Sequence, residues 1–134
     1  SIRFLQYANK SFIDKIYSKA VIESNTALEI AVNRKNKELG FKDSDVSKYL
    51  NHSGKIGVGQ RAKYILKKYY NFNDDVLICC DKMVKLRNDY VHSGKAINEQ
   101  NVDQYMLKFL YLIKALIDKE RIVIIDCYPN STSW

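Results

Sequence analysis

Residues 99–120, "EQNVDQYMLKFLYLIKALIDKE", carry the most regular hydrophobic pattern in the chain. Apolar side chains recur there at steps of three and four residues, which places them along one face of an α-helix. This face consists of Val102, Tyr105, Met106, Phe109, Ile113, Leu116 and Ile117. The pattern therefore predicts a long helix that buries one face against the rest of a helical protein.

The first part of the chain predicts another long helix, over residues 10–38. Its apolar positions are Ile13, Ile16, Tyr17, Ala20, Ala27, Leu28 and Ala31. Gly40 follows, and glycine at such a place commonly ends a helix. Glu23 lies in register with the apolar positions, and a half-buried carboxylate needs a partner. Glu29 lies on a different side of the same predicted helix.

The middle of the chain contains shorter helical segments separated by capping residues and glycines. Asn, Asp and Ser mark helix starts because their side chains accept hydrogen bonds from the first amide groups. The predicted elements are a short helix at 46–51 capped by Ser44 or Asp45, a helix at 60–71, and a helix that is capped by Asn73 or Asp74 and ends near Tyr90 or His92. The side chains predicted to face inward are Ala62, Ile65, Leu66, Tyr69, Val76, Cys80, Met83, Val84 and Val91.

The composition agrees with a helical protein. The chain has 134 residues with one proline and five glycines, and so few breakers favour long helices over many short strands. We expect a single all-α domain over residues 1–134, an up-and-down bundle of four to five helices. The chain starts at serine, so this domain can be a fragment of a longer protein. Residues 122–127 are rich in β-favouring side chains and predict a short strand or an extended arm.

Charge and cysteine content narrow the classes of function. The net charge of +7 attracts polyanions such as nucleic acid, although it also serves solubility. The three cysteines, two of them adjacent, form neither a disulfide framework nor a zinc-binding pattern. No apolar run is long enough to span a membrane. We therefore expect a cytoplasmic protein with reduced thiols, no membrane contact and no metal or other cofactor.

The tetrapeptide His-Ser-Gly-Lys occurs twice, at 52–55 and 92–95, and contains both histidines of the chain. A phosphate-binding P-loop needs a glycine five positions before its Gly-Lys pair. Tyr49 and Asp89 occupy those positions, so neither copy is a P-loop. His52, followed by Ser-Gly, fits an ordinary helix end. Only the second copy is therefore a candidate for chemistry.

His92 follows the stretch "RNDYV", which begins with Arg87 and Asn88. Asn88 and His92 are four residues apart and share one face of a helix. Arg87 lies about 140° round the helix from His92, an angle that the flexible arginine stem can close. Histidine can take a proton from a ribose 2′-hydroxyl near neutral pH, and arginine can hold the charge on a phosphate. The set suits phosphodiester cleavage without a metal; otherwise His92 only ends its helix and Arg87 is a surface cation.

The stretch "RNDYVH" resembles the R-x4-6-H motif of HEPN domains, in which a polar residue follows the arginine. "KAVIESNTALEIAV" is similar to the first-helix pattern of that family. "RNDYVHSGKAINEQNVDQYMLKFLYLIKALI" resembles the motif and the final helix of its Apea-like branch. The resemblance implies a helical bundle of about this length, with the motif on the third long helix and another long helix after it.

The resemblance also implies a metal-independent endoribonuclease whose composite active site forms in a homodimer. Carried over to this chain, Arg87 and His92 would be catalytic and Asn88 would be the supporting polar residue. Glu29 matches the glutamate of the first-helix pattern, and Glu23 is equally eligible to pair with Arg87. Family members act in toxin–antitoxin, phage-defence or RNA-processing systems. This implies RNA as the substrate and a regulatory or antitoxin protein as a further partner.

We expect the RNA backbone to be held by basic side chains near the motif, namely Lys82, Lys85 and Lys95, each of which is otherwise a solvated surface cation. Two other hypotheses stand beside the nuclease. One is a non-catalytic helical dimerisation module, and the other is a nucleotide- or RNA-binding accessory domain. An assay for RNA cleavage distinguishes both from an active enzyme.

Overall fold

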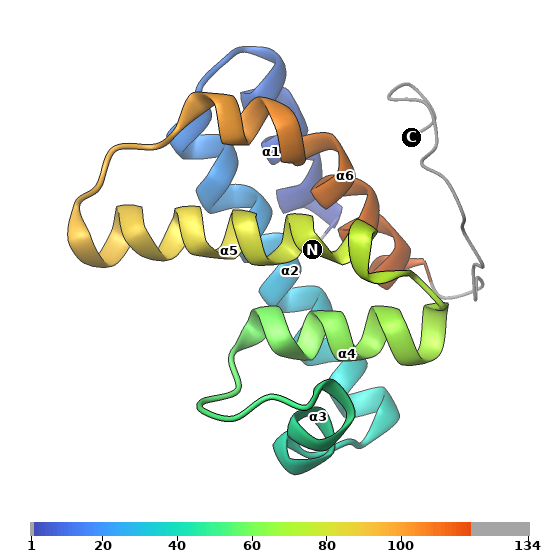
Figure 1. Cartoon of the computed structure of the whole chain (residues 1–134). Helices are drawn as coiled ribbons and strands as arrows, with labels where there is room; N and C mark the ends of the chain where they lie inside the picture. Colours follow the sequence, from blue (N-terminus) through green and yellow to red (C-terminus); the bar gives the residue numbers. More distant parts are fainter. Residues whose placement is uncertain (1, 119–134) are drawn as a thin grey trace.

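The computed structural model describes residues 2–118, which fold into six α-helices (Figure 1). In chain order these are α1 (Ile2–Ile13), α2 (Tyr17–Leu39), α3 (Asp43–Leu50), α4 (Val58–Tyr70), α5 (Asp74–Ser93) and α6 (Glu99–Ile117). The predicted all-α fold is confirmed, with six helices instead of four to five. Residues 2–118 contain no strand, and the segment 122–127 lies outside the described residues.

The prediction of one helix over 10–38 is wrong, because the chain turns between α1 and α2. Lys15 has a φ of 60°, in the left-handed region, and the amide of Ile16 donates to the carbonyl oxygen of Ser11 at 2.8 Å. Glycine is the usual residue for such a helix end. Because a lysine occupies this position, the sequence does not indicate that the helix ends here. Ile13 and Ile16, two of the apolar positions of the predicted helix, are 67% and 47% exposed.

The predicted helix starts are partly correct. Asn73 caps α5, and its side chain accepts a backbone amide at 3.0 Å. The start of α3 was predicted wrongly: this helix begins at Asp43, and its N-cap is Lys42 instead of Ser44 or Asp45. Asp45 lies inside the first turn, where its carboxylate accepts a hydrogen bond from the backbone amide of Lys42 at 2.8 Å. The aspartate therefore stabilises the start of α3 from the third helical position.

Helix α2 is the centre of the packing. It contacts α1, α4, α5 and α6, and it crosses α5 in the view of Figure 1. The apolar face predicted for α6 packs into the same core: Val102, Met106, Phe109, Ile113 and Leu116 are buried, and Tyr105 and Ile117 are half-buried. Contacts with both helices hold α5 between α2 and α6.

Only the first half of α5 enters the core, through Val76, Leu77, Cys79, Cys80 and Met83. The last turns project beyond α4 before the chain returns to α6 (Figure 1). Val91 was predicted to face inward, and this is wrong, because its side chain is 47% exposed. The helical pattern continues to Val91, but within residues 2–118 the neighbouring helices do not cover this end of α5. The candidate residues of the motif lie on this projecting end.

A buried asparagine links α2 to the middle of α5. Asn25 is 6% exposed, and its Nδ2 donates to the carbonyl oxygens of Val21 at 2.9 Å and of Met83 at 3.2 Å. In an α-helix the Met83 oxygen is also the acceptor position for the amide of Arg87. Asn25 therefore anchors the turn of α5 that leads into the projecting end.

Replacing Asn25 by alanine is expected to lower the free energy of unfolding by about 1–3 kcal/mol, because two buried hydrogen bonds are lost. Urea unfolding followed by circular dichroism measures this. The matched control is Asn33→Ala on the exposed side of the same helix, which should change stability by less than about 0.5 kcal/mol. Equal effects of the two substitutions would show that the link between α2 and α5 contributes nothing.

Candidate functional site

The motif residues Arg87, Asn88 and His92 lie on the projecting end of α5. Arg87 is half-buried, while Asn88 and His92 are exposed. None of the three is enclosed in the hydrophobic core, so all can reach a ligand in solvent. Because α5 ends at Ser93, His92 lies in the last helical turn.

The guanidinium of Arg87 turns round the helix toward Asn88. Its Nη1 donates to the Oδ1 of Asn88 at 3.2 Å. Asn88 and His92 share one face of α5, since four residues return the helix to nearly the same direction. The hydrogen bond therefore draws the cation toward the face that carries the imidazole.

The end of α5 is closed by a glycine cap. Gly94 has a φ of 64° and donates its amide to the carbonyl oxygen of Asp89. The amide of Lys95 donates to the same oxygen at 3.2 Å. This left-handed residue, which is usually glycine, ends the helix two residues after His92 and leaves the imidazole uncovered by a further helical turn.

The first-helix glutamates belong to α2, and their contacts differ from each other. Glu23 is half-buried and accepts a hydrogen bond from Ser11 Oγ at 2.6 Å, which ties α1 to α2. Glu29 is exposed. The predicted need of Glu23 for a partner is thus met by Ser11, while Arg87 contacts Asn88. Support of Arg87 by Glu23 or Glu29 stays a prediction.

The three lysines named from the sequence lie on or just after α5. Lys85 forms an ion pair with Asp89, with its Nζ 3.1 Å from Oδ2. Lys82, Lys85 and Lys95 are all exposed. Their surroundings allow contact with a polyanion, and such contact stays a prediction.

Sequence reasoning missed a groove beside Asn88. It has a volume of about 530 Å³ and is lined by Gly57, Val58, Gly59, Gln60, Asp81, Val84, Lys85, Asn88 and Asp89. The lining residues come from the start of α4 and from residues 81–89 of α5. Gly57 and Gly59 could have indicated this groove from the sequence. Two glycines at the start of a helix leave space between that helix and the helix that packs against it.

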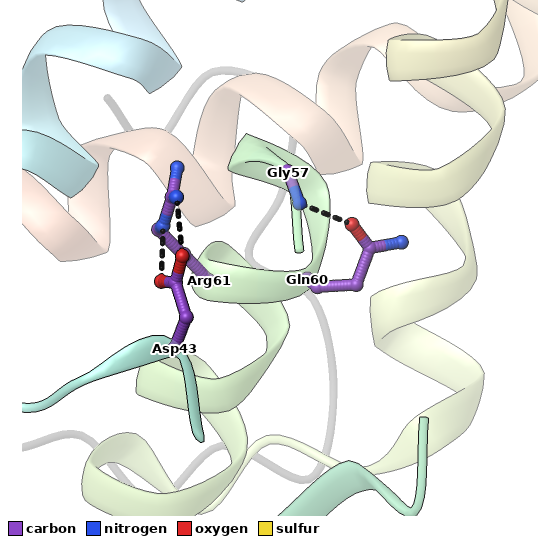
Figure 2. A network of polar contacts seen from close by, with 4 residues as sticks. All are labelled: Asp43, Gly57, Gln60 and Arg61. Atoms are coloured by element: carbon purple, nitrogen blue, oxygen red, sulfur yellow. Dashed lines mark hydrogen bonds and ion pairs between the residues drawn. The ribbon is translucent and has the colours of Figure 1, made fainter. Parts of the chain in front are cut away.

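Polar contacts hold the start of α4 in place (Figure 2). The amide of Gly57 donates to Gln60 Oε1 at 3.0 Å. Arg61 forms two hydrogen bonds with the carboxylate of Asp43, both of 3.0 Å, which join α4 to α3. A two-pronged guanidinium–carboxylate pair fixes direction as well as distance. These contacts therefore fix the position of the α4 residues that line the groove.

The thiols of α5 lie in the core, away from the motif. Cys79 and Cys80 are buried and form no disulfide. The Sγ of Cys79 donates to the carbonyl oxygen of Val76 at 3.1 Å. Hydrogen bonding to Cys79, together with burial, raises the pKa of the Cys80 thiol. This thiol stays protonated and is a poor nucleophile. Cys127 lies outside the described residues.

Two classes of feature are absent from residues 2–118. Their His, Cys, Asp and Glu side chains do not gather in any group of three or more that could hold a metal ion. Among the same residues, each helix is too short or too polar to cross a lipid bilayer.

Comparison with known proteins agrees with this arrangement. The family model described as Apea-like HEPN matches residues 6–117, which covers all of α2 to α6 and most of α1. No curated protein and no solved structure matches the chain. The family match spans most of the 134 residues, including the projecting end of α5 with its Arg-Asn and His. The chain therefore belongs to the Apea-like HEPN family.

Proposed function

We propose that this protein is a metal-independent endoribonuclease that works as a homodimer. The observation that carries the proposal is the position of Arg87, Asn88 and His92 outside the core on the projecting end of α5, where Asn88 and His92 are exposed and Arg87 is half-buried. Membership of a HEPN family supports an RNA-cleaving module. The Arg87 guanidinium can bind phosphate, and Asn88 holds it. The His92 imidazole, one helical turn after Asn88, can move protons.

The chemistry uses the substrate's own 2′-hydroxyl. His92 takes the proton from this hydroxyl, and the oxygen attacks the adjacent phosphorus. Arg87 neutralises the negative charge that builds on the phosphoryl oxygens, and Asn88 orients the guanidinium. The bond from phosphorus to the 5′-oxygen then breaks, and this oxygen takes a proton from a second histidine, the His92 of the partner subunit. The products are a 2′,3′-cyclic phosphate and a 5′-hydroxyl.

Exposed apolar side chains beside the motif support the homodimer. Tyr90 and Val91 are 38% and 47% exposed, and they lie directly before His92. Apolar groups that remain uncovered next to a polar site are typical of surfaces that bind another protein. Pairing two copies through this end of α5 would cover these side chains and bring two motifs together. A regulatory or antitoxin protein, in a toxin–antitoxin, phage-defence or RNA-processing system, would bind the same assembly.

RNA is expected to be cut in the presence of excess chelator, and a single 2′-deoxy substitution at the cleaved position is expected to abolish cutting there. The attacking oxygen is then missing, while the phosphate and the bases are unchanged. Gel analysis of end-labelled oligonucleotides, with mass spectrometry of the cyclic phosphate, measures this. A 2′-deoxy substitution two nucleotides away is the control. Cleavage at the deoxy position would contradict the mechanism.

The alternative function is a non-catalytic module for dimerisation or for binding nucleotides or RNA. The exposed Tyr90 and Val91 are compatible with this function as well. It would be favoured by RNA that stays intact at high protein concentration while binding remains and weakens steeply with salt. Salt-insensitive association with a protein would instead indicate a dimerisation module.

A further inference from the structure

We infer that the groove between the start of α4 and residues 81–89 of α5 is a nucleobase subsite that prefers guanine. The inference rests on the proposed function, since it assigns the groove to the RNA whose backbone the motif would cut. The groove touches the motif directly, because Asn88 is one of its lining residues. Its volume of about 530 Å³ is within the range of sites that bind small planar ligands.

Part of the groove lining is apolar. Val58, Gly59 and Val84 form this part of the lining. A Cβ added at Gly59 would lie 3.6 Å from Val84 Cγ2, so the glycine lets the start of α4 pack closely against Val84, which is half-buried. Bases in single-stranded RNA are bound by contacts to their faces and by hydrogen bonds to their edges. In this groove the valine side chains would contact the face of the base.

The rim of the groove presents a donor next to an acceptor. Lys85 Nζ lies 3.1 Å from Asp89 Oδ2, and both residues line the groove. The guanine edge carries the complementary order, an accepting O6 followed by the donating N1–H and N2–H. A carboxylate can accept from these two donors at once, as Asp and Glu accept from base amino groups. The exposed Lys85–Asp89 pair contributes little to stability, so a base can replace it at small cost.

The other polar residues of the groove are already fixed. Asp81 forms an ion pair with Lys63 of α4, with 3.0 Å between Nζ and Oδ1. Gln60 uses its Oε1 to accept the Gly57 amide, and this directs its remaining amide group as a donor. Asp89 is therefore the groove carboxylate whose ion pair lies within α5, whereas Asp81 is bound to α4.

The groove and the proposed catalytic histidine lie on one stripe of α5. Asp81, Lys85, Asn88 and His92 follow one another at steps of four, three and four residues, which places them along one helix face. Asn88 and His92 are separated by about 6 Å along the helix axis. A base held in the groove would therefore place the neighbouring phosphodiester close to Asn88 and His92.

Uracil fits this rim poorly. Its single N3–H donor lies between two carbonyl oxygens, and one of them would face the second oxygen of the Asp89 carboxylate. Inosine keeps the O6 and N1–H of guanosine but lacks the 2-amino group, so it tests the second hydrogen bond alone. The subsite thus predicts an order of affinity in which guanosine exceeds inosine and inosine exceeds uridine.

The test is a titration of the ¹⁵N-labelled protein with guanosine, inosine and uridine 5′-monophosphates, which carry the same phosphate. Guanosine monophosphate is expected to shift the amide signals of Gly57, Gly59, Lys85 and Asn88. Inosine monophosphate should bind about tenfold more weakly, since it loses one base contact. Asp89→Asn should lower the affinity for guanosine monophosphate by a similar factor, whereas Asp75→Asn, an exposed carboxylate at the other end of α5, should not.

The outcomes separate this inference from the proposed function. Equal shifts by all three nucleotides would show binding of phosphate alone and would overturn the base subsite. Unchanged groove signals would overturn it as well, even if the protein cuts RNA. Guanine-selective shifts in a protein that cuts no RNA would support the subsite and would count against the nuclease.

Discussion

Replacement of His92 by alanine is expected to lower the rate of RNA cleavage by about 10²–10⁴-fold, the usual contribution of a general base. The melting temperature should change little, because the side chain is exposed in the last turn of α5 and contributes nothing to the core. Single-turnover cleavage of a labelled RNA measures the rate, and circular dichroism measures the melting temperature. A loss of rate together with a retained fold would assign His92 to the chemistry.

His52 provides a matched control within the same chain. It is the only other histidine, and the same Ser-Gly-Lys follows it. Its backbone amide donates to the carbonyl oxygen of Ser47 at 2.9 Å, just after the end of α3, as expected for an ordinary helix end. His52→Ala should therefore leave the cleavage rate unchanged. Equal losses in the two variants, or full activity of His92→Ala, would contradict the proposed role of His92.

The helices that were predicted well are those in which local signals and tertiary packing agree. Residues 99–117 repeat apolar side chains at helical spacing, and the structure buries that face. Asn73 and Asp74 were the two caps predicted from side-chain chemistry, and Asn73 is the one that caps α5. In both cases the interactions that form the helix lie within it or along one continuous face. They can therefore be predicted from residues that are close together in the sequence.

The errors occur where the deciding interactions are not local. Lys15 turns the chain with a left-handed backbone, which lysine does not signal, so one helix was predicted where α1 and α2 pack against each other. Val91 continues the apolar pattern of α5, but it is exposed because the neighbouring helices do not extend that far. Helical periodicity predicts which face is apolar, whereas the extent of the neighbours decides how much of that face is covered.

In the candidate site, too, the local features could be predicted from the sequence and the features that depend on tertiary packing could not. Arg87, Asn88 and His92 lie within six residues of one helix, so their relation follows from helical geometry and was available from the sequence. The groove joins the segment 57–60 to the segment 81–89, and only the packing of α4 against α5 brings the two together. The contact of Glu23 with Ser11 likewise needed the turn at Lys15.

Mixing two inactive variants, Arg87→Ala and His92→Ala, is expected to restore part of the cleavage activity. If the subunits exchange freely, roughly half of the dimers contain one copy of each variant. Such a dimer keeps one guanidinium and one imidazole, on different subunits. A composite cleft can bring these two groups to the same phosphate, so cleavage returns, at a reduced rate because the second histidine is missing. Cleavage by each variant alone and by the mixture, at equal total protein, measures this.

Recovery of activity requires that the two groups act across the subunit boundary, since no single chain in the mixture has both. The control is a mixture of His92→Ala with the double variant Arg87→Ala/His92→Ala, which contains no His92 and should remain inactive. Subunit exchange is measured independently by energy transfer between labelled variants. Complete exchange without any recovery would contradict the composite cleft. In that case Arg87 and His92 of one chain would have to act on the phosphate together. The hydrogen bond from Arg87 to Asn88 draws the guanidinium toward the face of α5 that carries His92, and this contact would make such action geometrically possible.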